Sequence, residues 1–152
     1  AVPESLSGLA NGPVECGRRL LLYYSCATDG ADAVKVLSWR QGGLVSARGG
    51  HRPGTLVTRS LVVAGDRLLL NALAPGGVRV QLENDQGQAL AGFSGQECLP
   101  FSGDTLAHEV SWEGGASLEK LRGHSVRLRF TLYEADLFSF RFAVPAGAAE
   151  EG

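Results

Sequence analysis

Short stretches of alternating apolar and polar residues, separated by glycine-bearing turns, are the feature that most constrains this chain. The clearest is 126–132, where Val126, Leu128, Phe130 and Leu132 alternate with polar residues. Successive side chains of a strand point to opposite faces, so this stretch would have one dry face and one wet face. The stretch 138–142 repeats the period with phenylalanine on the dry face. The pattern predicts an all-β chain of antiparallel strands, packed as a two-sheet β-sandwich.

Turn residues delimit the other expected strands. Pairs such as Asp29-Gly30 and Pro53-Gly54, and the run Pro75-Gly76-Gly77, are typical of turns. One brief helical segment is expected at 117–122, with Ser117 as its N-cap. The strands predicted in this way are 19–25, 33–39, 44–47, 55–63, 67–73, 78–83, 107–112, 125–133 and 137–142.

The composition of the chain changes near residue 40. The first part, 1–40, contains the apolar run Leu20–Tyr24 and predicts an N-terminal β-hairpin segment, which cannot be stable alone and must pack on something else. Residues 41–144 predict the sandwich, and 145–152 predict a disordered tail because they have no apolar anchor.

Composition and charge argue against several classes of function. The net charge of −2 gives no basic footprint for nucleic acid, and the longest apolar run is too short to span a bilayer. The three histidines, His51, His108 and His124, share no ligand spacing, so neither a metal nor a cofactor is expected. Cys16 and Cys26 are able to meet across a hairpin, but buried free thiols are the favoured interpretation for them, and Cys98 leaves an odd count.

Polar and aromatic residues around an irregular stretch, 93–103, form the best candidate ligand site. Carboxylates of Glu97 and Asp104 would accept hydrogen bonds from sugar hydroxyls, His108 would add a polar group, and Phe101 would stack on a sugar ring. The alternative is a solvated connection in which Asp104 caps a turn.

The two tryptophans also have two interpretations. Exposed, Trp112 or Trp39 would offer an aromatic platform to a carbohydrate; buried, each anchors the core. Trp112 shares a strand face with Val110, which favours the core. Asp136, in a predicted turn, is expected to bind backbone amides.

Several segments resemble a known family. The segments 12–15 and 22–25 are similar to the last blade of the five-bladed β-propellers of glycoside hydrolase family 32. The segments 110–115, 121–130 and 135–142 resemble the C-terminal β-sandwich that follows such propellers. The resemblance covers roughly residues 12–142 and implies a sandwich of jelly-roll or concanavalin type.

This resemblance implies a non-catalytic accessory domain, because the family's catalytic carboxylates lie on propeller blades that this chain lacks. Its partners would be a β-propeller domain, in the same or another chain, and an oligosaccharide held by Glu97, Phe101, Asp104, His108 and Trp112. The alternative function is a purely structural module, for interdomain contact or oligomerisation, with no ligand. An independent enzyme has the least support, because nothing in the sequence positions a catalytic pair of carboxylates.

Overall fold

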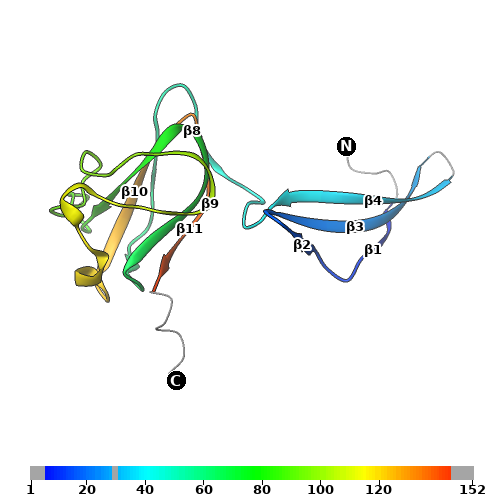
Figure 1. Cartoon of the computed structure of the whole chain (residues 1–152), viewed down its shortest axis with the longest axis horizontal. Helices are drawn as coiled ribbons and strands as arrows, with labels where there is room; N and C mark the ends of the chain where they lie inside the picture. Colours follow the sequence, from blue (N-terminus) through cyan, green and yellow to red (C-terminus); the bar gives the residue numbers. More distant parts are fainter. Residues whose placement is uncertain (1–5, 29–30, 145–152) are drawn as a thin grey trace, which may run out of the picture. The chain divides into compact units, whose positions relative to one another are not determined.

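This computed structural model describes residues 6–28 and 31–144 of the chain. The chain folds as two compact units, residues 1–44 and 45–152, and the described part of each is built from antiparallel strands (Figure 1). The predicted all-β, antiparallel class is therefore confirmed. The predicted tail, 145–152, and the predicted Asp29-Gly30 turn lie outside the described residues. No helix among the described residues is long and apolar enough to cross a membrane.

The first unit is a single sheet of four strands. The long strand β3 pairs with β4 along one edge, while β1 and β2 share its other edge. β3 and β4 form the hairpin that the sequence predicts, whereas β1 and β2 are too short to give an alternation pattern. Their bounds are β1 (Leu6–Leu9), β2 (Val14–Cys16), β3 (Arg19–Thr28) and β4 (Ala31–Arg40).

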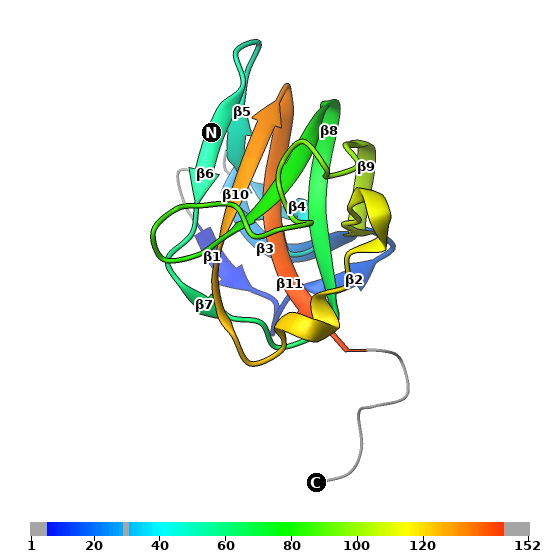
Figure 2. The ribbon, with the colours of Figure 1, turned by 90° about the vertical axis from the view of Figure 1, so that its left-hand side faces the viewer.

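The second unit is a seven-stranded antiparallel sheet that curls towards a barrel (Figure 2). Its strand order is β5-β11-β8-β10-β6, with β7 also on β10 and β9 also on β8. The strands are β5 (Ala47–Gly49), β6 (Gly54–Val57), β7 (Leu61–Val62), β8 (Arg67–Glu83), β9 (Phe101–Glu109), β10 (Ser125–Tyr133) and β11 (Ala135–Ala143).

The central strand β8 corrects one prediction. The expected turn at Pro75-Gly76-Gly77 does not separate two strands, because the chain continues as one strand of 17 residues. The first half of β8 pairs with β11 and the second half with β10. The glycines let the strand change direction between these partners: Gly77 has a φ of +146°, and a Cβ at Gly76 would lie 2.4 Å from the carbonyl oxygen of Tyr133.

Other predicted boundaries move for similar reasons. The expected strand 44–47 is replaced by β5, the expected strand 55–63 is split into β6 and β7, and the strand expected at 107–112 is β9, which starts and ends earlier. The predicted helix is a 3₁₀ turn, Leu118–Leu121, and the Ser117 side chain accepts a hydrogen bond from the Glu119 amide, as a cap should. For the strands, pairing with neighbouring strands decides where each one ends, and the local sequence pattern contains no information about that pairing.

The hydrophobic core of the second unit lies inside the curled sheet. The inner residues of the alternating stretch 126–132 are all buried, as predicted. The rings of Phe130 on β10 and Phe140 on β11 are 5.2 Å apart, so the inner faces of these two strands are in contact. Trp112 packs edge-on against Phe93 at 5.1 Å. Every member of this core cluster belongs to residues 63–137, and the partly buried side chains around it lie at 47–142.

Candidate functional site

The structure places the five residues predicted to hold a sugar in different local environments. Glu97 is used locally: its Oε2 accepts hydrogen bonds from the backbone N–H of Ser94, at 3.0 Å, and from the Ser94 hydroxyl, at 2.7 Å. These two bonds lower the pKa of Glu97. The carboxylate therefore closes a turn, which leaves it poorly placed to receive a ligand's hydroxyls.

The side chains of Phe101 and His108, two of the predicted site residues, are in direct contact. Their ring centroids are 4.2 Å apart with an interplanar angle of 30°. Both side chains are half-buried, and Phe101 packs against the core. Burial lowers the pKa of His108, so its imidazole is neutral at neutral pH.

Asp104 and Trp112 lie in contrasting environments. Asp104 is exposed on β9, opposite Leu73 of β8. Trp112 is 4% exposed, and its Nε1–H donates a hydrogen bond of 3.0 Å to the carbonyl oxygen of Val80. A buried indole offers no face to a ligand, so Trp112 belongs to the core, which is the alternative that the sequence pattern favours.

The sequence did not predict that the carboxylates of Glu83 and Asp136 are buried. Glu83 is fully buried; its Oε1 accepts hydrogen bonds from Gln81, at 2.9 Å, and from the Arg129 guanidinium, whereas its Oε2 has no partner. The sequence places Arg129 on a solvated strand face, but there it meets Glu83, which is completely enclosed. Asp136 is 9% exposed and is held by the side chains of Arg48 and Ser46, not by backbone amides as predicted.

The described residues do not provide a metal centre or a disulfide. They contain no group of three or more His, Cys, Asp or Glu side chains able to hold a metal ion. All three cysteines are free thiols; Cys26 and Cys98 are buried, but Cys16 is exposed, which corrects the expectation of a buried thiol there. Cys16 pairs with Arg19 at one end of β3, and Cys26 lies seven residues further along that strand. Burial raises the pKa of the Cys98 thiol.

The β1–β4 sheet is the part of the described structure that most clearly lacks a packing partner of its own. Tyr23, Val34, Val36 and Val14 share one face, which we call the Tyr23 face, and their exposed fractions are 45%, 76%, 49% and 56%. On the opposite face Leu37 is 50% exposed. The core cluster includes no residue of this unit. Tyr24 and Cys26, on the same face as Leu37, are buried, so the Tyr23 face is the more open of the two.

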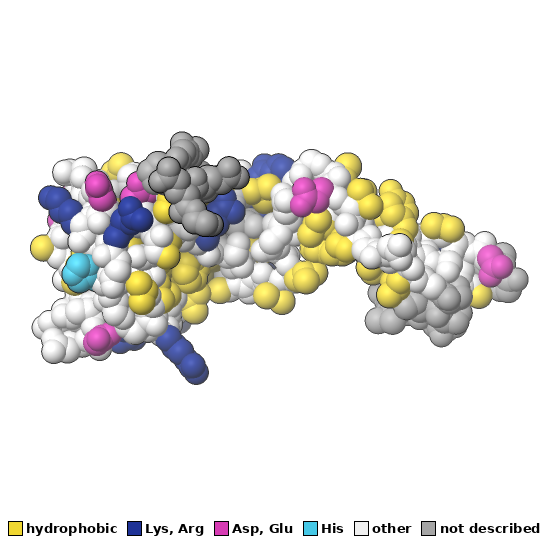
Figure 3. Space-filling view, turned by 90° about the horizontal axis from the view of Figure 1, so that it is seen from below, with side chains coloured by type: hydrophobic (Ala, Val, Ile, Leu, Met, Phe, Trp, Pro, Cys, Tyr) yellow, Lys and Arg dark blue, Asp and Glu magenta, His cyan; other side chains and the backbone are white. Residues whose placement is uncertain are grey.

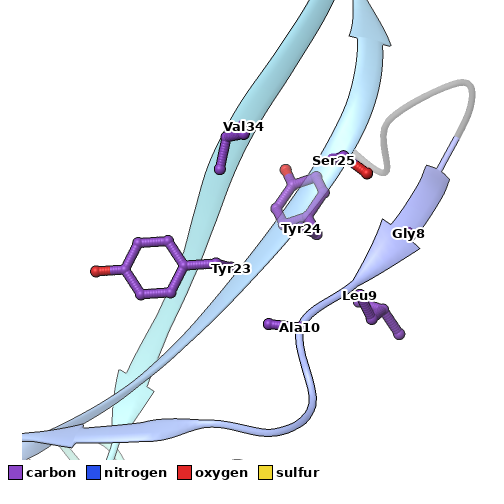
Figure 4. A pocket seen from close by; sticks show the side chains of 7 residues that line it. All are labelled: Gly8, Leu9, Ala10, Tyr23, Tyr24, Ser25 and Val34. Carbon is purple, nitrogen blue, oxygen red and sulfur yellow. The ribbon is translucent and has the colours of Figure 1, made fainter.

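A shallow hollow lies on the Tyr23 face beside β1. Tyr23, Ser25 and Val34 line it from β3 and β4, and Gly8 and Ala10 line it from the neighbouring edge (Figure 4). β1 approaches β3 closely here, because a Cβ at Gly8 would lie 3.0 Å from the Ser25 hydroxyl oxygen. On the face that Figure 3 shows, hydrophobic side chains spread along this unit with few charged ones among them. The surface suits an apolar protein contact better than a polar ligand.

Comparison with protein-family models, with curated proteins and with solved structures finds no match to this chain. The resemblance to the sandwich domain of glycosidase-like proteins therefore stays a prediction.

Proposed function

We propose that this chain is a non-catalytic interaction module, in which the β1–β4 sheet docks on another protein surface. The observation that carries this proposal is a four-stranded sheet with apolar side chains exposed on both faces. Large exposed apolar patches mark interaction sites, since soluble domains otherwise bury them. The apolar run Leu20–Tyr24 forms the middle of β3, the central strand of this sheet.

The second unit supplies the stable body of the module. We propose that it is a β-sandwich whose layers share β8: β11 and β9 pair with its first half, β10 pairs with its second half, and β6 pairs with β10. The contact between Phe130 and Phe140 supports this arrangement. A β-propeller domain, which the family resemblance implies, would be a suitable partner for the module.

Carbohydrate binding is a second candidate, and its best support is a groove that the sequence does not predict. Tyr133 is 42% exposed and lines this groove with Pro100, Arg79 and Thr131. An exposed tyrosine ring suits a sugar face. A glycan array with the wild type and Tyr133→Ala tests this: saturable binding that the variant loses would support it, and no binding by folded protein would reject it.

Position-specific photo-crosslinking tests the interaction proposal. A photo-reactive residue is placed at Val34 or Leu37 in the β1–β4 sheet, and at Val62 on β7 as a control of comparable exposure. We expect one recurring protein adduct from the sheet positions and none from Val62. A complex rebuilt from the purified components should then be lost in Val34→Ser/Val36→Ser. Equal adducts from all three positions, or none, would contradict the proposal.

A further inference from the structure

The groove beside Tyr133, which we call the Tyr133 groove, has main chain as part of its surface. Gly76 and Gly77 of β8 line it, and neither has a side chain to fill it. A glycine inside a strand often marks a place where a ligand approaches the backbone closely. The groove has a volume of about 390 Å³, within the range of small-molecule sites, and Pro53 and Pro100 line it as exposed residues. It is therefore large and open enough to take a ring-shaped ligand.

The strands beneath the Tyr133 groove are already paired on both sides. Residues 77–83 of β8 pair with 127–133 of β10, and Val78 also pairs with Phe101 of β9. On its other side β10 pairs with β6. A peptide that binds by adding a strand needs an unpaired strand edge. Recognition here must come from side chains and ring faces, which suits a sugar better than an extended peptide.

Tyr133 and Arg79 lie on the same face of the sheet. Tyr133 is directly opposite Gly77, and Arg79 is directly opposite Thr131. Opposite residues share a face, and so do residues two apart in a strand. Val78, between Gly77 and Arg79, is buried in the core on the other face. The groove therefore places a tyrosine ring that is 42% exposed next to an arginine side chain.

The positive charge of Arg79 has no carboxylate partner among the described residues. Its Nη1 donates hydrogen bonds of 3.3, 3.4 and 2.7 Å to three backbone carbonyl oxygens, those of Gly95, Gln96 and Cys98. These bonds hold the guanidinium in place but do not neutralise it. By contrast, Arg48 and Arg129 each contact a carboxylate. Glu134, which follows Tyr133 in the chain, contacts His51.

An arginine held in this way suits a ligand that carries a carboxylate, because the planar guanidinium matches a carboxylate in shape and charge. We propose that the Tyr133 groove binds an acidic sugar, a uronic-acid unit of an oligosaccharide, whose carboxylate pairs with Arg79 while its ring stacks on Tyr133. This inference rests on the second candidate function, carbohydrate binding in the same groove, and names the class of sugar.

Matched ligands test the role of the carboxylate. Isothermal titration calorimetry of the full chain uses the trimers of galacturonic, glucuronic and mannuronic acid. Each trimer is compared with its methyl ester, which keeps the sugar and removes the charge. We expect at least one acid trimer to bind, and its ester to bind about tenfold more weakly or worse, since the ester cannot pair with the guanidinium.

Matched variants test the role of Arg79. Thr131→Glu and Thr131→Gln introduce side chains of the same size, but only the glutamate places a negative charge opposite Arg79. Thr131→Glu should bind the acid trimer about tenfold more weakly than Thr131→Gln. Arg79→Met should lose the preference for acid over ester, and Tyr133→Ala should lose both ligands. Arg141→Gln, which changes an exposed arginine on β11 outside the groove, should bind as the wild type does.

The inference is overturned if no acid trimer binds, if an ester binds as well as its acid, or if the two Thr131 variants bind equally. A peptide whose C-terminal carboxylate binds more tightly than every trimer would also overturn it. If neutral glycans bind and Tyr133→Ala loses them, carbohydrate binding survives without the acidic preference. If no glycan binds, both fail. Neither result bears on docking by the β1–β4 sheet, because the groove belongs to the second unit.

Discussion

At the scale of single residues, the two buried carboxylates of the second unit are each paired with an arginine, and the two arginine side chains differ in how exposed they are to water. Glu83 is completely enclosed, while Arg129 is 38% exposed at its side chain. Asp136 is nearly buried, whereas Arg48 is 76% exposed. Removing the cation therefore leaves a buried carboxylate without a partner of opposite charge. Removing the carboxylate leaves a cation that water can solvate.

The Glu83–Arg129 pair should respond unequally to substitution at its two ends. We expect Arg129→Met to lower the free energy of unfolding by about 3 kcal/mol and Glu83→Gln by about 1–2 kcal/mol, because the first leaves the buried carboxylate without a cation. Urea unfolding measures both. Equal costs, or a larger cost for Glu83→Gln, would show that the buried charge is compensated by other means.

Asp136 should make stability depend on acid. The Arg48 and Ser46 side chains lower the pKa of Asp136 below its ordinary value of 3.8. The ionised Asp136 side chain therefore contributes its full stabilisation at pH values above its pKa in the unfolded chain. That stabilisation is lost as the pH falls through its lower pKa in the folded protein. In urea unfolding across pH, Asp136→Asn should be less stable than wild type near neutrality and converge with it in acid. Arg48→Gln should converge in the same way, and a gap that persists in acid would contradict the assignment.

At the scale of elements, the closure of the curled sheet depends on close backbone approach. A Cβ added at Gly49 of β5 would lie 2.2 Å from the carbonyl oxygen of Leu132 on β10. β5 and β10 are not hydrogen-bonded neighbours in the sheet order, so this contact brings one end strand against the strand next to the other end. Gly50, the next residue, would have no atom within 4 Å of an added Cβ.

These adjacent glycines form a matched pair of substitutions. Gly49→Ala should lower the free energy of unfolding by about 2–4 kcal/mol, because the sheet must open to admit the methyl group. Gly50→Ala should have an effect of about 0.5 kcal/mol or less. Thermal unfolding of both variants measures the difference, and similar midpoints would contradict the described closure.

At the scale of the whole molecule, apolar burial is concentrated in one unit. The core cluster is formed by residues of the second unit, while the first unit exposes apolar groups on both faces of its sheet. Local stability follows buried apolar contact, so the two units should not open with the same free energy.

Native-state hydrogen exchange at low protein concentration should reveal this difference. We expect the amides that pair β3 with β4 to exchange through openings of lower free energy than those that pair β8 with β10. Addition of a partner that covers the β1–β4 sheet should slow the first group selectively. Equal protection of both groups in the monomer would mean that the first unit is stable without a partner.

The sequence by itself determined the class of the fold and most of its long strands. The alternation at 126–132 predicts β10, and the predicted positions of β3 and β4 are close to those observed. Periodicity is a local property, and it is reliable where one face is buried. The same reasoning placed Trp112 beside Val110 and favoured the core, where Trp112 lies.

Only the tertiary structure decided which strands pair and which polar side chains meet. In the structure, the two strands predicted on either side of Pro75–Gly77 are one continuous strand. Glu83 is buried against Arg129, and Asp136 is paired with Arg48, 88 residues away in the chain. The tertiary structure also engaged two residues predicted to bind a sugar in other contacts: Glu97 in a turn and Trp112 in the core. Such contacts join positions that are distant in the chain, and the local pattern of residues contains no information about them.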